Sequence, residues 1–450
     1  MSNDSSRSRF DYDSLSDVAA DADRLGLDVP VQESVETLAE PHEIDGREVP
    51  NSMCANPIEG RDATPAGAPD ELSFRRYRRL AEGGSGMVWV EATAVTEDGK
   101  TSPAQFHITE STVDEFGELV DTMVEHGRGP DGADQRPFTV LQLTHSGRHS
   151  APDGEPAPVI AHRSEVYDEP GVDSHYVTDR ELDELQERFV EAAALASEAG
   201  FDAVDVKACH GYLLHELLFS YEREDSRYGG SYENRTRFLR ETVAAIREEV
   251  PDVTVTTRLN VYDRVPYPWG WGMARDGSLT PDLDEPVRLI EDLSDLGVSL
   301  VNVGMGNPYY NPDFERPADQ PVEGQDLPDE HPLTSIAENL EVTAALADRV
   351  DDVLLVGTGL SWLRQFFPNV AAAARDEGWM DLIGVGRASL ADPHYANRLL
   401  EHDGLPGDNV CIACSSCSQM MRDGVEAGCI VRDTEIYRPI YVEGRRQAGD

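Results

Sequence analysis

Four of the six cysteines of this 450-residue chain fall in one C-terminal stretch, at Cys411, Cys414, Cys417 and Cys429. The spacing C-x2-C-x2-C-x11-C is typical of a metal site or an iron–sulfur cluster. Four thiolates suit Zn2+ as well as a [4Fe–4S] cluster. Zinc sites more often have two C-x2-C pairs separated by a longer gap, so the pattern favours the cluster and indicates redox chemistry.

Only two of the 38 basic residues are lysines, Lys100 and Lys207. Lys207 ends an apolar run and precedes His210 and Tyr212, so we expect it to have a role beyond surface charge. Lys207 and His210 offer two donors for a carbonyl or anionic oxygen, and Tyr212 offers a phenol that can deliver a proton. A satisfied polar cluster at a strand end would equally account for any one of the three.

Further polar residues and glycines follow other apolar runs. Gln142 could pair a donor and an acceptor with a planar heterocycle. Arg258 is a fixed cation that could face an electron-rich ring, although it could equally be a structural ion-pair partner. Gly359, Gly386 and Arg387 follow the last two runs, where backbone N–H groups of a barrel can approach a phosphate closely.

These residues follow eight short apolar runs that alternate with amphipathic segments such as 180–198 and 233–249. The alternation predicts parallel strands joined by helices, and eight such units predict a (β/α)8 TIM barrel. A doubly wound sheet is the alternative, which the lack of G-x-G-x-x-G after the first strand disfavours. The predicted strands are Ser52–Ile58, Met87–Val95, Phe138–Leu143, Ala203–Ala208, Val253–Leu259, Leu300–Val303, Val353–Val356 and Leu382–Val385.

The predicted barrel occupies residues 46–405. Residues 1–45 are interpreted as an extension that packs on the barrel and is partly helical. Residues 406–450 are interpreted as a cysteine-rich segment with a short tail. The long segment Asn307–Pro332 is rich in Pro, Tyr and Asp and is expected to be an irregular active-site loop, because long loops in compact domains are often functional.

The chain carries 38 Lys and Arg against 86 Asp and Glu, a formal charge of −48. The acids lie between apolar positions along the whole length, unlike those of a disordered acidic tail. An acidic surface of this kind suits concentrated salt and argues against binding to nucleic acid or an anionic membrane. No run of about 18 apolar residues could span a bilayer, and the N-terminus lacks the apolar core of a secretory signal. We therefore expect a halophilic, cytoplasmic protein.

Taken together, the motifs resemble those of the Old Yellow Enzyme family of FMN-dependent oxidoreductases. The resemblance covers nearly the whole barrel, and its most specific part runs from His210 to Arg235. The motifs that carry it are Asn51…Asn56-Pro57-Ile58-Glu59-Gly60, Gln142-Leu-Thr-His-Ser-Gly-Arg148, Cys209-His-Gly-Tyr-Leu-Leu-His215, Asp225-Ser-Arg-Tyr-Gly-Gly-Ser-Tyr-Glu-Asn-Arg235 and Gly386-Arg387…Ala391-Asp392-Pro393.

The resemblance implies that FMN lies across the top of the barrel. Asn56, Pro57 and Ile58 would line one side of the flavin through their backbone, and Ala92 would close it from the second strand. Tyr212 matches the proton donor of the family. A hydride would pass from flavin N5 to the β-carbon of an activated alkene, and the proton would pass from Tyr212 to the α-carbon.

The remaining flavin contacts are also implied by the resemblance. Gln142 would hydrogen-bond the pyrimidine edge of the flavin. Arg258 would lie near N1 and O2 and stabilise the negative charge of the reduced flavin. Gly359, Gly386 and Arg387 would hold the phosphate.

The cysteine spacing is similar to that of the iron–sulfur branch of the family, which contains 2,4-dienoyl-CoA reductase and trimethylamine dehydrogenase. In those multidomain enzymes a [4Fe–4S] cluster passes single electrons to FMN from an attached FAD domain. This sequence ends at Asp450 without such a domain. We therefore expect electrons to come from NAD(P)H, from a ferredoxin or other separate reductase, or from another subunit.

Two departures from the family pattern bear on the substrate and the flavin. Family members commonly hold the activating oxygen of the substrate with a His and a second His or Asn, whereas this chain has Lys207 and His210. A lysine, as a charged point donor, would prefer a carboxylate or enolate oxygen. Glu59 stands where some relatives have a flavin-tuning cysteine.

We expect an ene reductase that takes a small-molecule substrate; the sequence does not specify an oligomeric state. An FMN/iron–sulfur amine dehydrogenase is the alternative within the same class. A Schiff-base lyase with Lys207 as nucleophile is the alternative from another class, but it leaves Gln142, Arg258 and the cysteines without a role. Aromatic residues that could form a cage for an amine are Tyr262, Trp269, Trp271, Tyr309 and Tyr310.

Overall fold

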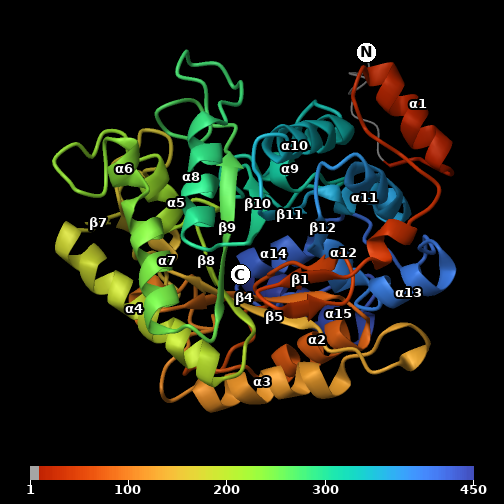
Figure 1. Cartoon of the computed structure of the whole chain (residues 1–450), viewed down its shortest axis with the longest axis horizontal. Coiled ribbons are helices and arrows are strands. Elements are labelled where there is room, and N and C mark those ends of the chain that lie inside the picture. Colours follow the sequence, from red (N-terminus) through yellow and green to blue (C-terminus); the bar gives the residue numbers. More distant parts are fainter. Residues whose placement is uncertain (1–9, 450) are drawn as a thin grey trace.

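Eight parallel strands form a closed barrel at the centre of the molecule, as predicted (Figure 1). The computed structural model describes residues 10–449. The spatial order of the strands is β10-β11-β12-β3-β4-β5-β8-β9, so neighbours in sequence are neighbours in the barrel. The barrel strands are β3 (Met53–Ala55), β4 (Met87–Ala94), β5 (Phe138–Thr144), β8 (Ala203–Val206), β9 (Thr254–Tyr262), β10 (Leu300–Met305), β11 (Leu354–Gly357) and β12 (Leu382–Val385).

Two strand boundaries differ from the prediction in ways that matter for the site. Strand β3 ends at Ala55, and the last backbone bond of this segment to the barrel runs from the Asn56 amide to the Val385 carbonyl, at 3.0 Å. Pro57 has no N–H group and cannot extend the ladder, so the chain leaves the barrel there. Strand β9 continues to Tyr262, which places Arg258 inside the strand rather than at its end.

Helices cover the outside of the barrel. In α4, the side chain of Thr178 accepts a bond from the Glu181 amide, and Glu181 bonds back to the Thr178 amide, which fixes the start of the helix. The longer helices are α2 (Glu71–Glu82), α3 (Val113–His126), α4 (Asp179–Glu198), α7 (Arg237–Glu249), α8 (Asp284–Asp295), α10 (Pro332–Ala347), α11 (Phe367–Asp376) and α13 (Tyr395–His402). Shorter elements are α5 (Leu213–Leu218), α6 (Tyr232–Arg235), α12 (Arg387–Ala391) and the strand pair β6 (Val159–Ile160) and β7 (His175–Tyr176).

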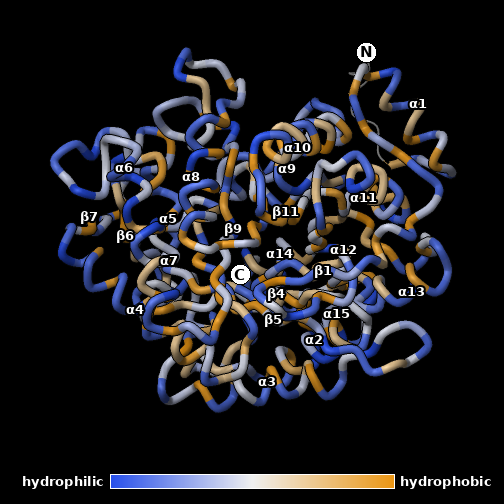
Figure 2. Tube along the Cα trace, in the orientation of Figure 1, coloured by the Kyte–Doolittle hydropathy of each residue, from blue (hydrophilic) through white to orange (hydrophobic). Residues whose placement is uncertain are grey.

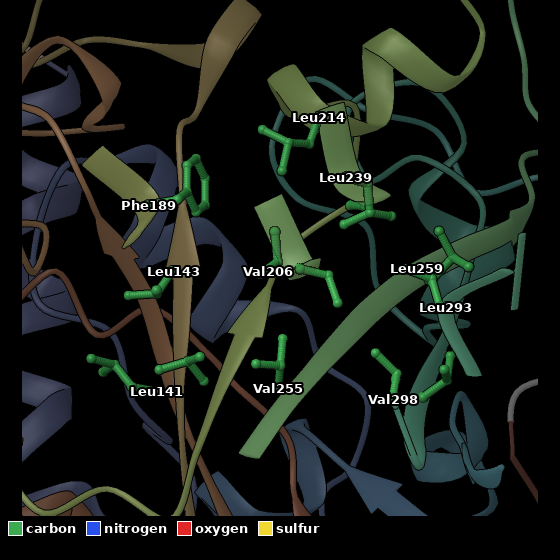
Figure 3. Close-up of a cluster of buried hydrophobic side chains, with 14 of the residues drawn as sticks. Leu141, Leu143, Phe189, Val206, Leu214, Leu239, Val255, Leu259, Leu293 and Val298 are labelled. Atoms are coloured by element: carbon green, nitrogen blue, oxygen red, sulfur yellow. The ribbon is translucent and has the colours of Figure 1, made fainter. Parts of the chain in front are cut away.

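The main core lies between the barrel and this helical layer. Leu141 and Leu143 of β5, Val206 of β8 and Val255 of β9 are fully buried, and they belong to the same apolar cluster as Phe189 of α4 (Figure 3). Each such side chain contributes about 1.5–3 kcal/mol when removed from water. Hydrophobic residues accordingly concentrate in the strands, whereas hydrophilic residues dominate the outer loops (Figure 2).

A hairpin that the sequence did not predict closes the amino-terminal end of the barrel. It consists of β1 (His42–Ile44) and β2 (Arg47–Val49). Ile44 and Val49 are buried in a cluster with residues at the amino-terminal ends of several barrel strands. The opposite end, where the strands have their carboxyl termini, is left open for a site. Helix α1 (Leu15–Leu25) falls within the expected extension 1–45, of which residues 1–9 lie outside the described part.

The cysteine segment packs back onto the open end of the barrel. It contains α14 (Ser416–Arg422) and α15 (Thr434–Gly449), and Asp433 before α15 pairs with Arg75 at 2.7 Å and Arg79 at 2.6 Å on α2 (Figure 1). The long loop 307–331 contains only the short helix α9 (Pro312–Glu315). Its Asp319 amide bonds to the Ala413 carbonyl at 3.0 Å, so the loop and the cysteine segment form one wall. Within residues 10–449 no helix has both the length and the apolar character needed to traverse a bilayer.

Candidate active site

A cavity of about 760 Å3 lies at the carboxyl ends of the strands. Seven of the eight barrel strands, or the segments that directly follow them, contribute the predicted site residues. Every side chain that the sequence assigned to cofactor binding or catalysis lines this cavity: Asn56, Pro57, Ile58, Ala92, Gln142, Lys207, His210, Tyr212, Arg258, Gly359, Gly386 and Arg387.

Asp205 of β8 lies behind the cavity and holds two of its lining residues, although no motif in the sequence singled it out. Its Oδ2 accepts bonds from Gln142 Nε2 at 2.6 Å and Trp89 Nε1 at 2.9 Å, and its Oδ1 accepts the Arg258 amide at 2.6 Å. Burial raises the pKa of Asp205 to about 6, against the opposing effect of these bonds. The carboxylate thereby fixes the orientation of Gln142 and the backbone at Arg258.

Arg258 presents a buried guanidinium to the cavity. The residue is 7% exposed, and its Nε has no hydrogen-bond partner among the described residues. A buried cation that lacks a partner is costly, so the position fits a bound group that carries negative charge or electron-rich oxygen atoms. The reduced form of a flavin has this character at its pyrimidine edge.

Glycines after β11 and in and after β12 line the cavity and keep its wall free of side chains there. Gly359 has a φ of 93°, a left-handed conformation that favours glycine. A Cβ at Gly384 would lie 2.4 Å from Asn56 Oδ1, and a Cβ at Gly386 would lie 3.1 Å from the Ile58 side chain. Arg387 begins α12 and donates to the Pro317 carbonyl at 2.9 Å. This corner therefore fits a phosphate group.

Buried Tyr212 and half-buried Glu59 form a hydrogen-bonded pair. The Tyr212 hydroxyl donates to Glu59 Oε1 at 2.8 Å, and Thr101 donates to the other carboxylate oxygen at 3.0 Å. The Lys207 ammonium lies 3.6 Å from the centre of the Tyr212 ring, within the range of a cation–π contact. Burial and the Glu59 charge raise the pKa of Tyr212, so the phenol keeps its proton. Burial lowers the pKa of Lys207.

His210 pairs with Glu315, which comes from the loop after β10. His210 Nε2 lies 3.1 Å from Glu315 Oε1, and both side chains are largely buried. His210 has a φ of 66°, a left-handed conformation that is uncommon for a residue with a side chain. Burial opposes ionisation of Glu315, but the contact with His210 and nearby arginines lowers its pKa overall. Glu315 is therefore a carboxylate that orients the imidazole.

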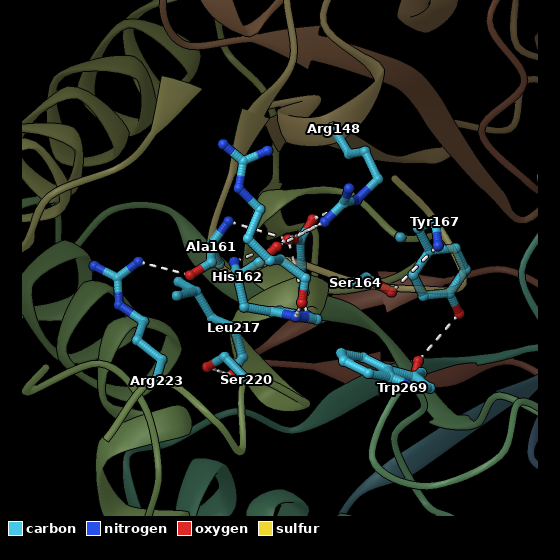
Figure 4. A network of polar contacts seen from close by, with 12 residues as sticks. Arg148, Ala161, His162, Ser164, Tyr167, Leu217, Ser220, Arg223 and Trp269 are labelled. Carbon is cyan, nitrogen blue, oxygen red and sulfur yellow. Dashed lines mark hydrogen bonds and ion pairs between the residues drawn. The ribbon is translucent and has the colours of Figure 1, made fainter. Parts of the chain in front are cut away.

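Arg148, from the motif that follows β5, is tied into a structural network. Its guanidinium donates to Glu216 Oε1 at 2.8 Å and to the His162 carbonyl at 2.9 Å (Figure 4). The same carboxylate oxygen accepts the amides of Ala161 and His162, at 3.1 and 3.2 Å. Burial is outweighed by Glu216 and Asp168, which raise the pKa of Arg148. This arginine supports the wall of the cavity and is not free for a ligand.

The four C-terminal cysteines all border one small cavity next to the main one. Cys417 and Arg387 line both cavities. Backbone amides of Ala413 and Arg432 donate to the sulfurs of Cys411 and Cys429, each at 3.4 Å. In the described range, no three His, Cys, Asp or Glu side chains already have the arrangement of a metal site. The thiols thus share a cavity but are not drawn together into a ligand set.

The aromatic residues proposed for an amine cage are not assembled. Tyr309 and Tyr310 border the cavity, but Tyr262 and Trp271 are buried in the core. Trp269 stacks on His162, with ring centroids 5.8 Å apart. Sequence reasoning selected these residues from loops whose paths it could not predict, and three of the five point elsewhere.

The sequence matches a family of flavin-dependent oxidoreductases and two NADPH dehydrogenases. Residues 37–268 match the NADH:flavin oxidoreductase / NADH oxidase family. The NADPH dehydrogenase of Bacillus velezensis is 29% identical over 323 residues, which cover 71% of this chain and 81% of that protein. The NADPH dehydrogenase of Listeria welshimeri is 33% identical over 220 residues, 48% of this chain and 60% of that protein.

The fold also resembles that of solved structures. A 2-naphthoyl-CoA reductase in complex with 2-naphthoyl-CoA superposes with a TM-score of 0.71 at 22% sequence identity. The superposition covers 91% of this chain and 58% of that one. The chain therefore spans about 60% of the length of the Listeria relative and of this structure.

Proposed function

Since the chain belongs to the NADH:flavin oxidoreductase / NADH oxidase family, we propose that it is an FMN-dependent oxidoreductase that reduces an activated C=C bond. The observation that carries the proposal is the buried Arg258 guanidinium, whose Nε has no partner among the described residues, in the same cavity as Gly359 and Gly386. In a planar cofactor that has an electron-rich ring and a phosphate, the ring would contact Arg258 and the phosphate would contact the glycines. NAD(P)H, or a ferredoxin or separate reductase, would supply the electrons.

The chain would hold FMN through residues in or directly after six of the barrel strands. Gln142, which Asp205 keeps in place, would bond the pyrimidine edge, and Arg258 would face the ring oxygens. Gly359, Gly386 and Arg387 would bind the phosphate. When bound, FMN would supply the hydride for the alkene. The barrel would orient the flavin ring toward the substrate and exclude water from the face of the ring that the substrate contacts.

Tyr212 would deliver the proton that completes the reduction. Its raised pKa keeps the phenol protonated at neutral pH. Glu59 holds the hydroxyl through a bond of 2.8 Å and is a positioning residue for it. Because Lys207 packs on the ring of the same tyrosine, the phenol is held from two sides. Tyr212 then gives its proton to the α-carbon, and solvent restores it through the open mouth of the cavity.

Lys207 and His210 would bind the activating oxygen of the substrate. Both line the cavity on the Tyr212 side. Glu315 fixes His210 from behind. A lysine whose pKa is lowered by burial gains most from a partner that bears negative charge, so a carboxylate or an enolate oxygen suits this position better than a simple ketone.

The four cysteines would bind a [4Fe–4S] cluster, with zinc as the alternative. All four face the same small cavity, and two already accept N–H bonds of the kind that tune cluster sulfurs. Cys417 borders the flavin cavity as well. This position would let a cluster exchange single electrons with the flavin. The chain would thus be related in function to the iron–sulfur branch of its family.

The cavity disfavours the two alternative functions. Amine oxidation would need a cage for a cation, but seven basic side chains line the cavity against four acidic ones, and only two of the expected aromatics are present. A Schiff-base lyase would use Lys207 alone and would leave the Asp205 network without a role. Trapping of a substrate on Lys207 by borohydride would favour the lyase.

The first experiment is an absorption spectrum with iron, zinc and sulfide analysis of protein purified without oxygen in molar salt. Flavin bands together with broad absorbance near about 400 nm and ~4 Fe per chain would support a cluster-bearing flavoenzyme. Flavin with zinc, or with no metal, would retain the ene reductase and remove the one-electron route. Protein without flavin after reconstitution with FMN would overturn the proposal.

A further inference from the structure

Three arginines that have no role in the proposed flavin site or proton transfer line the cavity: Arg61, Arg316 and Arg422. Arg61 lies in the loop between β3 and α2, Arg316 lies in the long loop after β10, and Arg422 is the last residue of α14 in the cysteine segment. They come from segments that are far apart in the sequence, so the fold alone brings them together.

The balance of charge in the cavity is opposite to that of the chain. The whole chain has 86 acidic and 38 basic residues, whereas the cavity is lined by seven basic and four acidic side chains. Most of the basic ones already have partners or roles. Arg148 is tied to Glu216, Arg258 and Arg387 face the proposed flavin, and Lys207 packs on Tyr212.

Arg61, Arg316 and Arg422 have few or long-range partners. The Arg422 side chain has no hydrogen bond or ion pair with a side chain or backbone group of residues 10–449. Arg61 donates only to the Met421 carbonyl, at 2.8 Å, and its Nε is buried without a partner in residues 10–449. Arg316 Nε lies 3.8 Å from Glu315 Oε2, and Arg316 donates to Ser418 Oγ at 3.4 Å; His210 lies 3.1 Å from the other oxygen of the same carboxylate.

Two of the three charges act on one another, and Arg61 is hydrogen-bonded to Met421, the residue before Arg422. Burial and the charge of Arg316 lower the pKa of the Arg422 guanidinium. Arg61 is held with a φ of 51°, a left-handed conformation that costs energy in a residue with a side chain. In a chain with more than twice as many acids as bases, mutual repulsion of these arginines is a cost that a bound anion would offset.

The cluster extends from the proton donor toward Arg387, which donates to the carbonyl of Pro317, the residue after Arg316, at 2.9 Å. The charges of Arg61 and Arg316 both act on the Tyr309 phenol, and Tyr309 in turn interacts with Tyr212. Arg61 is two residues from Glu59, which accepts the Tyr212 hydroxyl. A molecule that reacts beside Tyr212 can therefore reach the arginines with a group remote from its reacting bond.

From this arrangement we infer that Arg61, Arg316 and Arg422 form a binding site for an anionic oxygen group, a carboxylate or phosphate, carried by a molecule that enters the cavity. The identity of that molecule, a substrate or an electron donor of an oxidoreductase, rests on the proposed function. The group could belong to the alkene, or it could be the extra phosphate that distinguishes NADPH from NADH. Guanidinium groups bind both through paired N–H donors.

A matched pair of ligands tests the site without turnover. The probes are 4-(4-carboxyphenyl)butan-2-one and its neutral carboxamide counterpart, both saturated and unable to be reduced. Their binding to the holoenzyme is measured by calorimetry at one fixed salt concentration. The substitution Arg422→Gln should weaken binding of the acid by roughly three- to tenfold and leave the amide unchanged. Arg422→Lys should retain most of the affinity for the acid.

Turnover then identifies the source of the anion. The corresponding enones are compared as substrates, and NADPH is compared with NADH in the reduction of the flavin. A higher KM of Arg422→Gln for the acid enone alone assigns the site to the substrate. Slower flavin reduction by NADPH alone assigns it to the electron donor. Arg288→Gln, which removes an exposed arginine that pairs with Glu233, serves as control and should change none of these values.

The inference is overturned if Arg422→Gln and Arg316→Gln bind the acid and the amide as wild type does and show unchanged use of NADPH. Failure of the proposed function would look different. If neither enone is reduced by the wild-type holoenzyme, the ene-reductase proposal fails. The calorimetric comparison of acid with amide still reports on the arginine site in that case.

Discussion

A buried network of charged side chains anchors the loop between β3 and α2, and its contribution to stability can be tested directly. Arg76 of α2 donates to Asp62 Oδ1 at 2.6 Å and lies 3.2 Å from Glu91 Oε1. The exposed fractions of the Arg76, Asp62 and Glu91 side chains are 7%, 2% and 1%. Glu91 Oε2 accepts the Gly60 amide at 2.7 Å, which anchors the loop that carries Asn56 to Glu59.

The substitution Arg76→Met would leave two carboxylates buried without their cation. Removal of one partner from a buried ion pair costs about 3–5 kcal/mol. With an unfolding entropy of about 2.1 cal/mol/K per residue, this loss lowers Tm by about 3–5 °C for a chain of this length. The loss of free energy is measured by urea unfolding, followed by tryptophan fluorescence in fixed salt.

The effect should depend on pH in a defined direction. Burial raises the pKa of Glu91, and Arg76 opposes that rise, so removal of Arg76 raises the pKa further. The folded variant then binds more protons than the unfolded chain between the ordinary glutamate pKa and the raised value. Its stability therefore falls as pH rises through that window. The loss of unfolding free energy caused by Arg76→Met should be larger at about pH 9 than at about pH 6.

Two comparisons complete the test. Arg288→Met removes an exposed arginine that pairs with Glu233 and should cost less than about 1 kcal/mol. Adding Glu91→Gln to Arg76→Met should restore part of the lost stability, because one buried charge disappears. A loss below about 1 kcal/mol that is equal at both pH values would refute the reasoning.

Three further results are expected. Tyr212→Phe should slow alkene reduction by at least about 100-fold and leave reduction of the flavin near normal in stopped-flow measurements; equal losses in both steps would count against Tyr212 as proton donor. Arg258→Met should weaken FMN binding by roughly tenfold or more in a flavin-fluorescence titration, because a charged hydrogen bond is lost, and an unchanged affinity would contradict its place at the flavin. Cys417→Ala should lower iron below ~4 per chain with FMN retained, and unchanged iron would exclude Cys417 as a ligand.

The barrel and most of the proposed flavin site were accessible from the sequence. Apolar runs of strand length between amphipathic segments predict alternating strands and helices, and residues that follow such runs meet at one end of a parallel barrel. Gln142, Lys207, Arg258 and Gly386 could therefore be assigned to one site before any coordinates. This reasoning is local: it needs only the strand order and the direction in which each strand runs.

The partners of those residues could not be predicted in the same way. Asp205 read as one acid among 86 in the chain, yet it holds both Gln142 and the Arg258 backbone. Glu59 attracted notice only as a departure from the family pattern, and its bond to Tyr212 joins residues 153 positions apart. The aromatic cage failed for the same reason, since loop residues point where the tertiary packing sends them.

Sequence alone thus determined the class of fold, the family to which the chain belongs and the end of the barrel at which the proposed site residues gather. Tertiary structure decided which charges face one another. The arginines at positions 61, 316 and 422, which line one cavity, are distributed over three segments that show no common motif. The spacing of apolar residues along the chain predicts which residues are buried, because this pattern is local in the sequence. A pair of charges depends on the distance between two side chains, and the path of the loops sets that distance.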